Sequence, residues 1–299
     1  MTEPDVTVSI VSFNTRDLLR AAIRAALATA GVSIEIVVVD NGSNDGSAEM
    51  VEREFTSAQL VRNPDNRGFA AANNVAIRCA KGRYILLLNP DTEVRPDTIP
   101  TLAGYLDAHP ETGICGPRIL FPDGSFQSCG YPFPTVLSEI RQSKNVGKAM
   151  KALAGPETFV ADPPHAREVD WVDGACFMIR RAVIEQIGPL DEQFFLYAEE
   201  LDWCFNARKA GWAVASVPAA EMVHHLGKSS SQVSDRSLIY FMDTRLRYYR
   251  KNRGLATALF VSLVYVAGCL KQLRPEPHKS KVKLGAIRLW WGSLLSPRR

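Results

Sequence analysis

Short apolar runs alternate with amphipathic segments over about the first 120 residues of this 299-residue chain. Runs of apolar and β-branched residues predict β-strands at 6–12, 34–39, 59–61 and 84–88. Apolar residues spaced three or four apart predict helices at 16–29 and 69–80. Strands that alternate with helices are typical of a parallel sheet covered by helices on both faces. The pattern therefore predicts an α/β fold with a Rossmann-like, mostly parallel central sheet.

The pattern is looser beyond residue 109. The predicted elements there are strands at 114–120 and 175–179, a helix at 201–211, and short strands at 213–217 and 221–225. The stretch from about 121 to 170 is rich in Pro, Gly and polar residues. We interpret it as a long functional loop rather than as a separate domain.

Charge is distributed unevenly along the chain. Residues 245–299 contain thirteen Lys or Arg and one acidic residue, Glu276, so this tail has a net charge of +12. Residues 1–244 have a net charge of −9, although the whole chain has only +3. A basic tail on an acidic body predicts an anionic partner, either a membrane surface or a nucleic acid.

The apolar content of this tail favours a membrane. Residues 255–270 contain no charged side chain, but they fall short of the roughly 20 residues that a spanning helix needs. Trp290 and Trp291 beside Arg288 are typical of a helix that lies on a bilayer surface. We therefore expect a helical membrane-associating tail and no binding of nucleic acid. The alternative is a helical pair packed on the domain or on a second subunit, as in a homodimer.

The remaining composition predicts a cytoplasmic protein. The six cysteines are scattered without a C-x-x-C pair, which fits free thiols in a reducing compartment and gives no zinc site. Residues 1–5 lead directly into the first strand, and no signal peptide is predicted there. With the basic tail, this predicts peripheral attachment to the inner face of the cell membrane.

Polar residues follow three of the predicted strands. Asp40 ends the second strand, Asn66, Arg67 and Gly68 follow the third, and Asp91 lies just past the fourth. The carboxyl ends of parallel strands meet at one edge, where α/β proteins bind their ligands. One carboxylate there accepts hydrogen bonds from a nucleoside, and another holds a cation that binds a diphosphate. The sequence thus predicts a nucleotide site.

Other nucleotide-binding classes lack their motifs in this chain. No G-x-G-x-x-G follows the first strand, which disfavours a dinucleotide fold, and the P-loop motif G-x-x-x-x-G-K-[ST] is absent. A receiver domain needs two acidic residues after that strand, where this chain has Ser12, Phe13 and Asn14. A nucleotidyltransferase needs a glycine-rich basic loop after the first strand. This chain has no such loop there, which disfavours this class.

Several segments, in order, resemble the family 2 glycosyltransferases and, among them, the rhamnosyltransferase-like branch. These segments are 8–14 (VSIVSFN), 38–47 (VVDNGSNDGS), 66–69 (NRGF) with 73–74 (NN), 88–91 (LNPD), 171–175 (WVDGA) and 195–204 (FLYAEELDWC). The resemblance covers about residues 6–230. It implies a GT-A fold over 1–235, followed by a basic and apolar helical region over 236–299. It also implies inverting transfer of a sugar from a nucleoside diphosphate to an acceptor hydroxyl.

The resemblance implies roles for single residues on the donor side. The implied donor-binding residues are Ser12, Asn14, Asp40, Asn41, Gly42, Asn66, Arg67, Gly68 and Asn89. Asp91 would be the main ligand of Mg²⁺ or Mn²⁺, and His224 would complete the shell. The usual D-x-D motif has Asn89 at its first position here, which leaves one carboxylate fewer and predicts a weaker metal site.

The catalytic base is expected in the acidic segment at 199–202. Glu200 occupies the base position of the family, and Glu199 and Asp202 are the alternatives. Acidic residues in the first turn of a helix also stabilise it through the helix dipole. Asp173 and Gly174 would line the acceptor side, and Trp171 either stacks on a sugar or packs in the core.

The expected activity is metal-dependent hexosyl transfer. The resemblance favours L-rhamnose from dTDP-rhamnose, given to a hydroxyl of a lipid-linked or cell-surface polysaccharide precursor. The alternative is a non-catalytic scaffold that binds nucleotide sugars within a polysaccharide assembly complex. It is supported by Asn89 and by Glu, in place of the family's Asp, at position 200. A scaffold would bind the donor without turnover.

Overall fold

The computed structural model describes residues 3–143, 162–225 and 234–271. The chain divides into two compact units. The first comprises Met1–Pro132, Phe159–Phe195 and Glu199–Ser229, and the second comprises Phe133–Thr158, Leu196–Ala198 and Ser230–Arg299. All site residues predicted from the sequence lie in the first unit. The domain boundary predicted at residue 235 stays a prediction.

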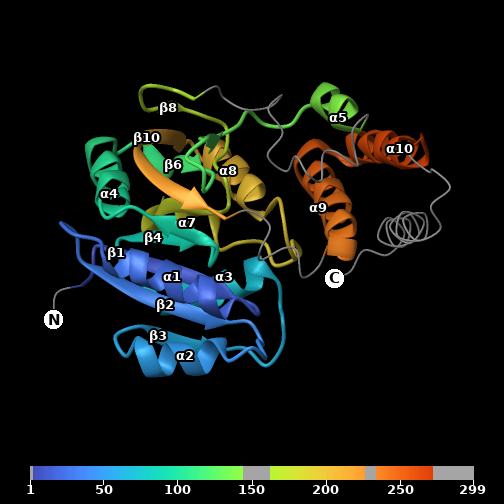
Figure 1. Ribbon diagram of the computed structural model, residues 1–299. Coiled ribbons are helices and arrows are strands. Elements are labelled where there is room, and N and C mark those ends of the chain that lie inside the picture. Colours follow the sequence, from blue (N-terminus) through green and yellow to red (C-terminus); the bar gives the residue numbers. More distant parts are fainter. Residues whose placement is uncertain (1–2, 144–161, 226–233, 272–299) are drawn as a thin grey trace. The chain divides into compact units, whose positions relative to one another are not determined.

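A ten-stranded sheet forms the centre of the first unit (Figure 1). Its strands are β1 (Val6–Ser12), β2 (Ile34–Asp40), β3 (Gln59–Arg62), β4 (Tyr84–Leu88), β5 (Thr92–Val94), β6 (Thr112–Leu120), β7 (Phe126–Ser128), β8 (Arg167–Glu168), β9 (Cys176–Arg180) and β10 (Ala213–His224). The order across the sheet is β3-β2-β1-β4-β9-β6-β10-β5, with β7 paired to β6 and β8 to β10.

The sheet is mixed rather than mostly parallel. The half built from β3, β2, β1 and β4 is parallel, as the sequence predicts. In the other half, β9 runs antiparallel to both β4 and β6, and β5 runs antiparallel to β10. A parallel pair needs a crossover connection, usually a helix, and the regular alternation of strand and helix that supplies one ends near residue 108.

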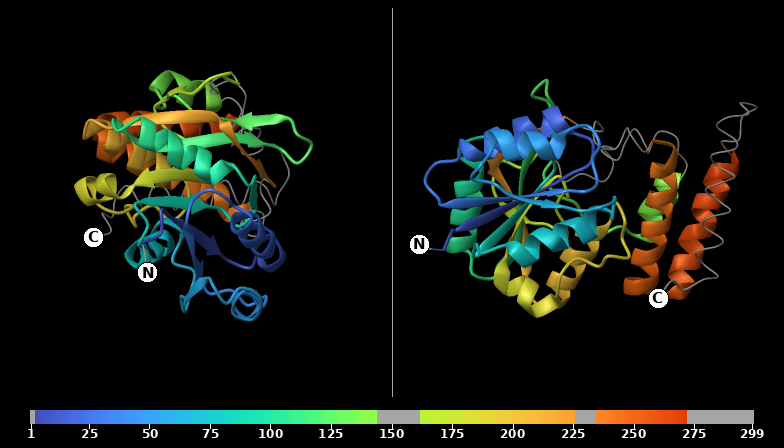
Figure 2. Two further views of the ribbon diagram at one scale, coloured as in Figure 1. Left: turned by 90° about the vertical axis from the view of Figure 1, so that its left-hand side faces the viewer. Right: turned by 90° about the horizontal axis from the view of Figure 1, so that it is seen from below.

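Helices cover both faces of this sheet (Figure 2). One face is covered by α1 (Arg16–Leu27), α2 (Ser47–Glu54) and α4 (Thr98–Ala108), and the other by α3 (Phe69–Cys79), α7 (Arg181–Ile187) and α8 (Glu199–Lys209). Alternate residues of a strand point to opposite faces. Accordingly, Leu86 of β4 packs in one cluster with Leu19, whereas Leu87 packs in the other with Trp203. The strands β1 and β4 and most of β2 are buried on both faces, which explains their continuous apolar runs, whereas β3 is a partly exposed edge strand.

Two predictions about the second half of the chain are revised. The two short strands expected at 213–217 and 221–225 form the single strand β10, whose pairing with β6 shifts register between Val217 and Glu221. The region expected to be a loop, 121–170, contains β7, β8 and the helix α5 (Val136–Ser143), and its residues 144–161 lie outside the described part.

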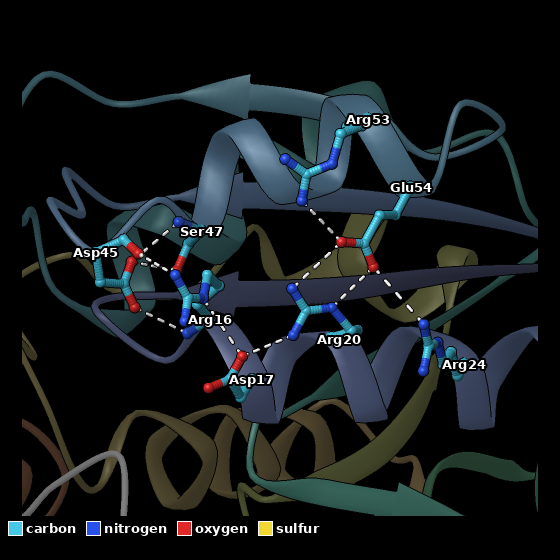
Figure 3. Close-up of polar contacts among 8 residues, drawn as sticks. All are labelled: Arg16, Asp17, Arg20, Arg24, Asp45, Ser47, Arg53 and Glu54. Atoms are coloured by element: carbon cyan, nitrogen blue, oxygen red, sulfur yellow. Dashed lines mark hydrogen bonds and ion pairs between the residues drawn. The ribbon is translucent and has the colours of Figure 1, made fainter.

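A polar cluster joins the helices α1 and α2 next to the loops that follow β1 and β2 (Figure 3). Asp45 accepts hydrogen bonds from the backbone N–H of Arg16, at the start of α1, and from that of Ser47, at the start of α2. Glu54 accepts two hydrogen bonds from Arg20 across the two helices. Burial opposes ionisation of Asp45, but the bonds from Ser47 and Arg16 lower its pKa. The cluster fixes the first turns of both helices.

The second unit contains α5, α9 (Ser234–Arg253) and α10 (Leu255–Lys271). Glu139 of α5 is fully buried and accepts hydrogen bonds from Tyr249 of α9 and Tyr265 of α10. Within the described ranges, no helix combines the length and the apolar character needed to cross a bilayer. The surface helix expected around Trp290 and Trp291 lies outside the described residues.

Candidate functional site

The residues expected to contact the nucleoside begin where β1 and β2 end side by side. Ser12 pairs in register with Asp40, the last residue of β2. Asp40 is 4% exposed, and its Oδ2 accepts a hydrogen bond from the Ser43 N–H at 3.1 Å. Its Oδ1 is buried and has no hydrogen-bond partner among the described residues. Because a buried polar atom is costly to leave unpaired, this oxygen is suited to accept a hydrogen bond from a ligand.

Asn14 joins the two loops that border Asp40. Its backbone N–H donates to the Ser43 hydroxyl at 2.9 Å, and its Oδ1 accepts the Asn44 N–H at 2.8 Å. Asn14 has a φ of 53°, a conformation that Asn tolerates better than most residues. Ser12 lies beneath this loop, where its hydroxyl shares a hydrogen bond with Thr15. These contacts therefore hold together the two loops next to Asp40.

Asn41 holds the adjacent loop together. Its Oδ1 accepts from the Asn63 side chain and the Arg67 N–H, and its Nδ2 donates to Asn66 Oδ1 and the Gly68 carbonyl. All these contacts are with protein atoms, so the side chain of Asn41 acts on the site by fixing the 63–68 loop. Asn66 Oδ1 additionally accepts the Gly68 N–H.

Two glycines allow loops to approach each other closely. A Cβ on Gly42 would lie 2.9 Å from backbone atoms of Asp65, and one on Gly68 would lie 2.5 Å from the Phe195 carbonyl oxygen. Both have positive φ values, of 81° and 86°. The Phe69 N–H donates to the same Phe195 carbonyl at 2.8 Å. The loop after β3 is therefore joined to the segment that leads into α8.

Asp91 and His224 meet through the antiparallel pairing of β5 and β10. His224 is in register with Thr92, and the His225 N–H donates to the Asp91 carbonyl. As a result, His224 Nε2 lies 3.5 Å from Asp91 Oδ1, and both side chains are buried. Burial lowers the pKa of His224, but the hydrogen bond and charge of Asp91, with the charge of Asp173, outweigh it and raise this pKa.

This pair suits a divalent cation only if a ligand contributes further donors. The described residues hold no group of three or more His, Cys, Asp or Glu arranged for a metal. Adjacent donors on an octahedral ion at about 2.1 Å are roughly 3 Å apart, close to the observed 3.5 Å. Asn89 is half-buried; its backbone N–H donates to the Ala175 carbonyl, and its own carbonyl accepts from Thr92.

The turn expected on the acceptor side is built around Asp173. Its Oδ2 accepts a hydrogen bond from the Tyr131 hydroxyl at 3.0 Å, and its Oδ1 accepts the Ala175 N–H. Burial, with the charges of Asp173 and Glu200, raises the pKa of Tyr131 well above its usual value. Trp171 stacks on the Tyr131 ring at 4.3 Å between centroids and donates to the carbonyl of Pro132. Of the two roles expected for Trp171, these contacts favour packing.

The acidic segment at the start of α8 contains three differently placed carboxyl groups. Glu199 is buried, and burial together with the charge of Glu200 raises its pKa well above the usual value. Glu200 is half-buried and faces the Asp173–Gly174 turn, because a Cβ on Gly174 would lie 3.2 Å from its Cδ. Asp202 is buried and accepts a hydrogen bond from Asn206, one turn along the same helix.

Three residues at the site are absent from the sequence prediction: Gln127, Ser128 and Tyr131. Gln127 contacts His224 Nδ1 at 3.1 Å, and Ser128 donates to Asp173 at 3.4 Å. They lie in the region interpreted as a loop. No motif marks them. The pairing of β7 with β6 places Gln127 and Ser128 here, and an isolated bridge to Trp171 places Tyr131.

The fold is GT-A-like. A mannosyltransferase from Pyrobaculum calidifontis, PcManGT, solved in complex with GDP-Man and Mn²⁺, superposes with a TM-score of 0.60 at 17% identity, covering 100% of this chain and 89% of that one. A family model described as glycosyl transferase family 2 matches residues 7–188, more than half of the chain. The protein therefore belongs to glycosyl transferase family 2.

Its relatives include rhamnosyltransferases, which confirms the resemblance seen in the motifs. N-acetylglucosaminyl-diphospho-decaprenol L-rhamnosyltransferase of Mycobacterium tuberculosis is 27% identical over 221 residues, 67% of this chain and 69% of that protein. The dTDP-rhamnosyl transferase RfbF of Shigella flexneri is 26% identical over 219 residues, 72% of this chain and 67% of that protein.

Proposed function

We propose that this glycosyltransferase moves L-rhamnose from dTDP-rhamnose to a hydroxyl of a lipid-linked precursor of a cell-wall or surface polysaccharide, with inversion at the anomeric carbon. The observation that carries the proposal is the placement of Asp40, the Asp91–His224 pair and Glu200 along one edge of the sheet. The sugar and donor follow the Shigella relative, and the acceptor class follows the mycobacterial relative.

In this proposal the donor lies along the carboxyl ends of β2, β1 and β4. Asp40 Oδ1, which is buried and unpaired among the described residues, accepts a hydrogen bond from the nucleoside. The strands β2 and β4 flank β1 and are therefore about 10 Å apart, or two strand spacings. Asp91 and His224 would hold the Mg²⁺ or Mn²⁺ ion, which would supply positive charge beside the diphosphate.

Glu200 takes the proton from the acceptor hydroxyl in this mechanism. It faces the Asp173–Gly174 turn, and a base on that side activates an acceptor opposite the departing diphosphate, which gives inversion. The raised pKa of Glu199 favours its protonated form, which accepts no proton. The hydrogen bond from Asn206 gives Asp202 a role within its own helix. These contacts support Glu200 as the base.

The first test measures donor binding by calorimetry. Thymidine, uridine and guanosine diphosphate sugars are titrated with and without Mn²⁺, and dTDP-rhamnose is expected to bind tightest and only with the metal. Asp40→Asn should weaken binding about 10- to 100-fold, the value of a hydrogen bond to a charged group. Asp97→Asn, a change at an exposed acid, is the control. Equal affinity for all three series refutes the donor, and binding without transfer favours the scaffold.

We also propose that the second unit attaches the protein to the cytoplasmic face of an anionic membrane. The outward side of α10 is apolar, because Leu255, Leu259, Phe260 and Leu263 are 53%, 41%, 49% and 58% exposed. The preceding helix ends in three cations, Arg250, Lys251 and Arg253. Anionic lipid complements this charge, at about 1 kcal/mol per cation near the surface, whereas a homodimer would bring two basic tails together.

Vesicle sedimentation tests this attachment. The full-length protein should bind vesicles of phosphatidylglycerol and phosphatidylcholine, and the double variant Leu259→Glu/Leu263→Glu should remain in solution. The control is Leu27→Glu, which changes another exposed leucine, 44% accessible, on α1 of the first unit. A protein that ignores vesicles but is dimeric by light scattering, and monomeric as the double variant, would show that the face binds a second copy.

A further inference from the structure

Gln127 contacts the side of His224 that faces away from Asp91. It lies on β7, is 5% exposed, and its Nε2 is 3.1 Å from His224 Nδ1. The other ring nitrogen, Nε2, faces Asp91 Oδ1 at 3.5 Å. The imidazole is thus held between one carboxylate and one amide, and each of them contacts a different ring nitrogen.

The Gln127 contact determines which nitrogen of a neutral His224 carries the proton. When Gln127 Nε2 donates, Nδ1 must accept, so the proton resides on Nε2 and points at Asp91. This tautomer suits the metal-free site because it satisfies the carboxylate. It does not suit a cation, because binding at Nε2 requires the lone pair of that nitrogen.

The opposite tautomer is available through the same glutamine. Gln127 Oε1 is buried and has no hydrogen-bond partner among the described residues. Rotation of the amide by half a turn exchanges its two ends, so that Oε1 accepts a hydrogen bond from a protonated Nδ1. One proton leaves Nε2 to solvent and another is taken up at Nδ1, so the ring stays neutral. Nε2 then presents its lone pair toward Asp91.

We propose that Gln127 is a positioning residue that selects the His224 tautomer able to bind a divalent cation. The proposal rests on the metal site of the proposed function. Ring nitrogens opposite a metal commonly donate to a fixed acceptor, and the loss of such a partner costs about 10- to 100-fold in metal affinity. The amide differs from a carboxylate in that it serves both tautomers, which fits a cation that arrives and leaves with the nucleotide.

The test compares Gln127→Met and Gln127→Glu by titration with Mn²⁺ in the presence of dTDP, with free Mn²⁺ measured by electron paramagnetic resonance. Methionine fills a similar volume without an acceptor, and it should weaken Mn²⁺ binding about 10- to 100-fold. An ionised glutamate has only hydrogen-bond acceptors, so it accepts from Nδ1–H. Gln127→Glu should therefore bind Mn²⁺ as tightly as the wild type or more tightly. Gln59→Met, at an exposed position of β3, is the control.

The outcomes separate this inference from the function on which it rests. The inference is overturned if Gln127→Met binds Mn²⁺ with wild-type affinity, or if both Gln127 variants bind it equally weakly. In either case, Mn²⁺ binding by the wild type would still support the proposed metal site. If Asp91→Asn leaves Mn²⁺ binding unchanged, or the wild type binds none, both proposals fail. Nitrogen-15 spectra of the imidazole should also show the proton on Nε2 without metal in the wild type and on Nδ1 in Gln127→Glu.

Discussion

Two adjacent glutamates at the start of α8 give a matched pair of substitutions. Glu199→Gln and Glu200→Gln each replace a carboxyl group by an amide of nearly the same shape, one residue apart. Glu200 is half-buried beside Gly174, whereas Glu199 is buried and its pKa is raised well above the usual value. We expect the first substitution to leave catalysis nearly intact and the second to abolish most of it.

The magnitudes follow from the protonation state of each group. A positioned general base contributes about 10²- to 10⁴-fold, so Glu200→Gln should lower kcat by that factor, or roughly 2.7 to 5.4 kcal/mol in the barrier. Burial and the charge of Glu200 raise the pKa of Glu199, which favours its neutral form, so an amide there should change little. Its effect on kcat should stay below about threefold, or roughly 0.7 kcal/mol. Calorimetry should show unchanged donor affinity in both variants.

The assay measures dTDP release from dTDP-rhamnose with a short-chain polyprenyl-diphosphate-linked N-acetylglucosamine as the acceptor. Thermal unfolding of each variant shows whether it is folded. A Glu199→Gln variant that loses activity as strongly as Glu200→Gln, while remaining folded, would refute the assignment of the base. An active Glu200→Gln variant would also refute Glu200 as the base, and Asp202 would then be the next candidate to test.

The remaining predictions concern support of the site. Gly68→Ala should raise the KM for the donor, because its Cβ would lie 2.5 Å from the Phe195 carbonyl at a φ of 86°; an unchanged KM contradicts the proposed loop contact. Tyr131→Phe removes the hydrogen bond to Asp173 and should raise the KM for the acceptor but not that for the donor, in the same assay. Asp45→Asn should lower the free energy of unfolding by about 1 kcal/mol at neutral pH. Since the folded state lowers the pKa of Asp45, the stabilisation that it gives is present above about pH 4 and is lost as the pH falls further; denaturant curves whose difference from the wild type persists at pH 2 would contradict this.

The residues expected on the donor side were predictable because their signals are local. Asp40 ends one apolar run and Asp91 lies three residues past another, so a short window of sequence gives both the strand and the polar residue near its end. Parallel strands joined by helices then place their carboxyl ends at one edge without further information. The turn glycines Gly42 and Gly68 belong to the same windows, although their close approaches to Asp65 and Phe195 emerge only from the packed structure.

The side expected to bind the acceptor was less predictable because it depends on pairing between distant segments. Tyr131 and Asp173 are joined by a hydrogen bond across a separation of 42 residues, and Gln127 meets His224 across 97. The segment that contains Gln127 and Tyr131 has no periodicity of its own and was interpreted as a loop. Trp171 shows the same limit, because its choice between a sugar and the core depends on Tyr131, whose ring already occupies one of its faces.

The Asp91–His224 pair, which we propose binds the cation, depends both on a sequence motif and on the pairing of distant strands. Asp91 lies three residues past the end of β4, but His224 comes 133 residues later in the chain. The register of β5 with β10, in which Thr92 faces His224, brings the two together. A shift of one residue in an antiparallel pair turns every side chain to the other face. This register therefore decides whether His224 or its neighbour His225 faces the carboxylate of Asp91. The observed ladder selects His224 and leaves His225 to pair with Glu93. The register of β5 with β10 is therefore needed to form the Asp91–His224 pair. Substitutions at residues that fix this register should lower activity as strongly as substitutions of Asp91 or His224 themselves.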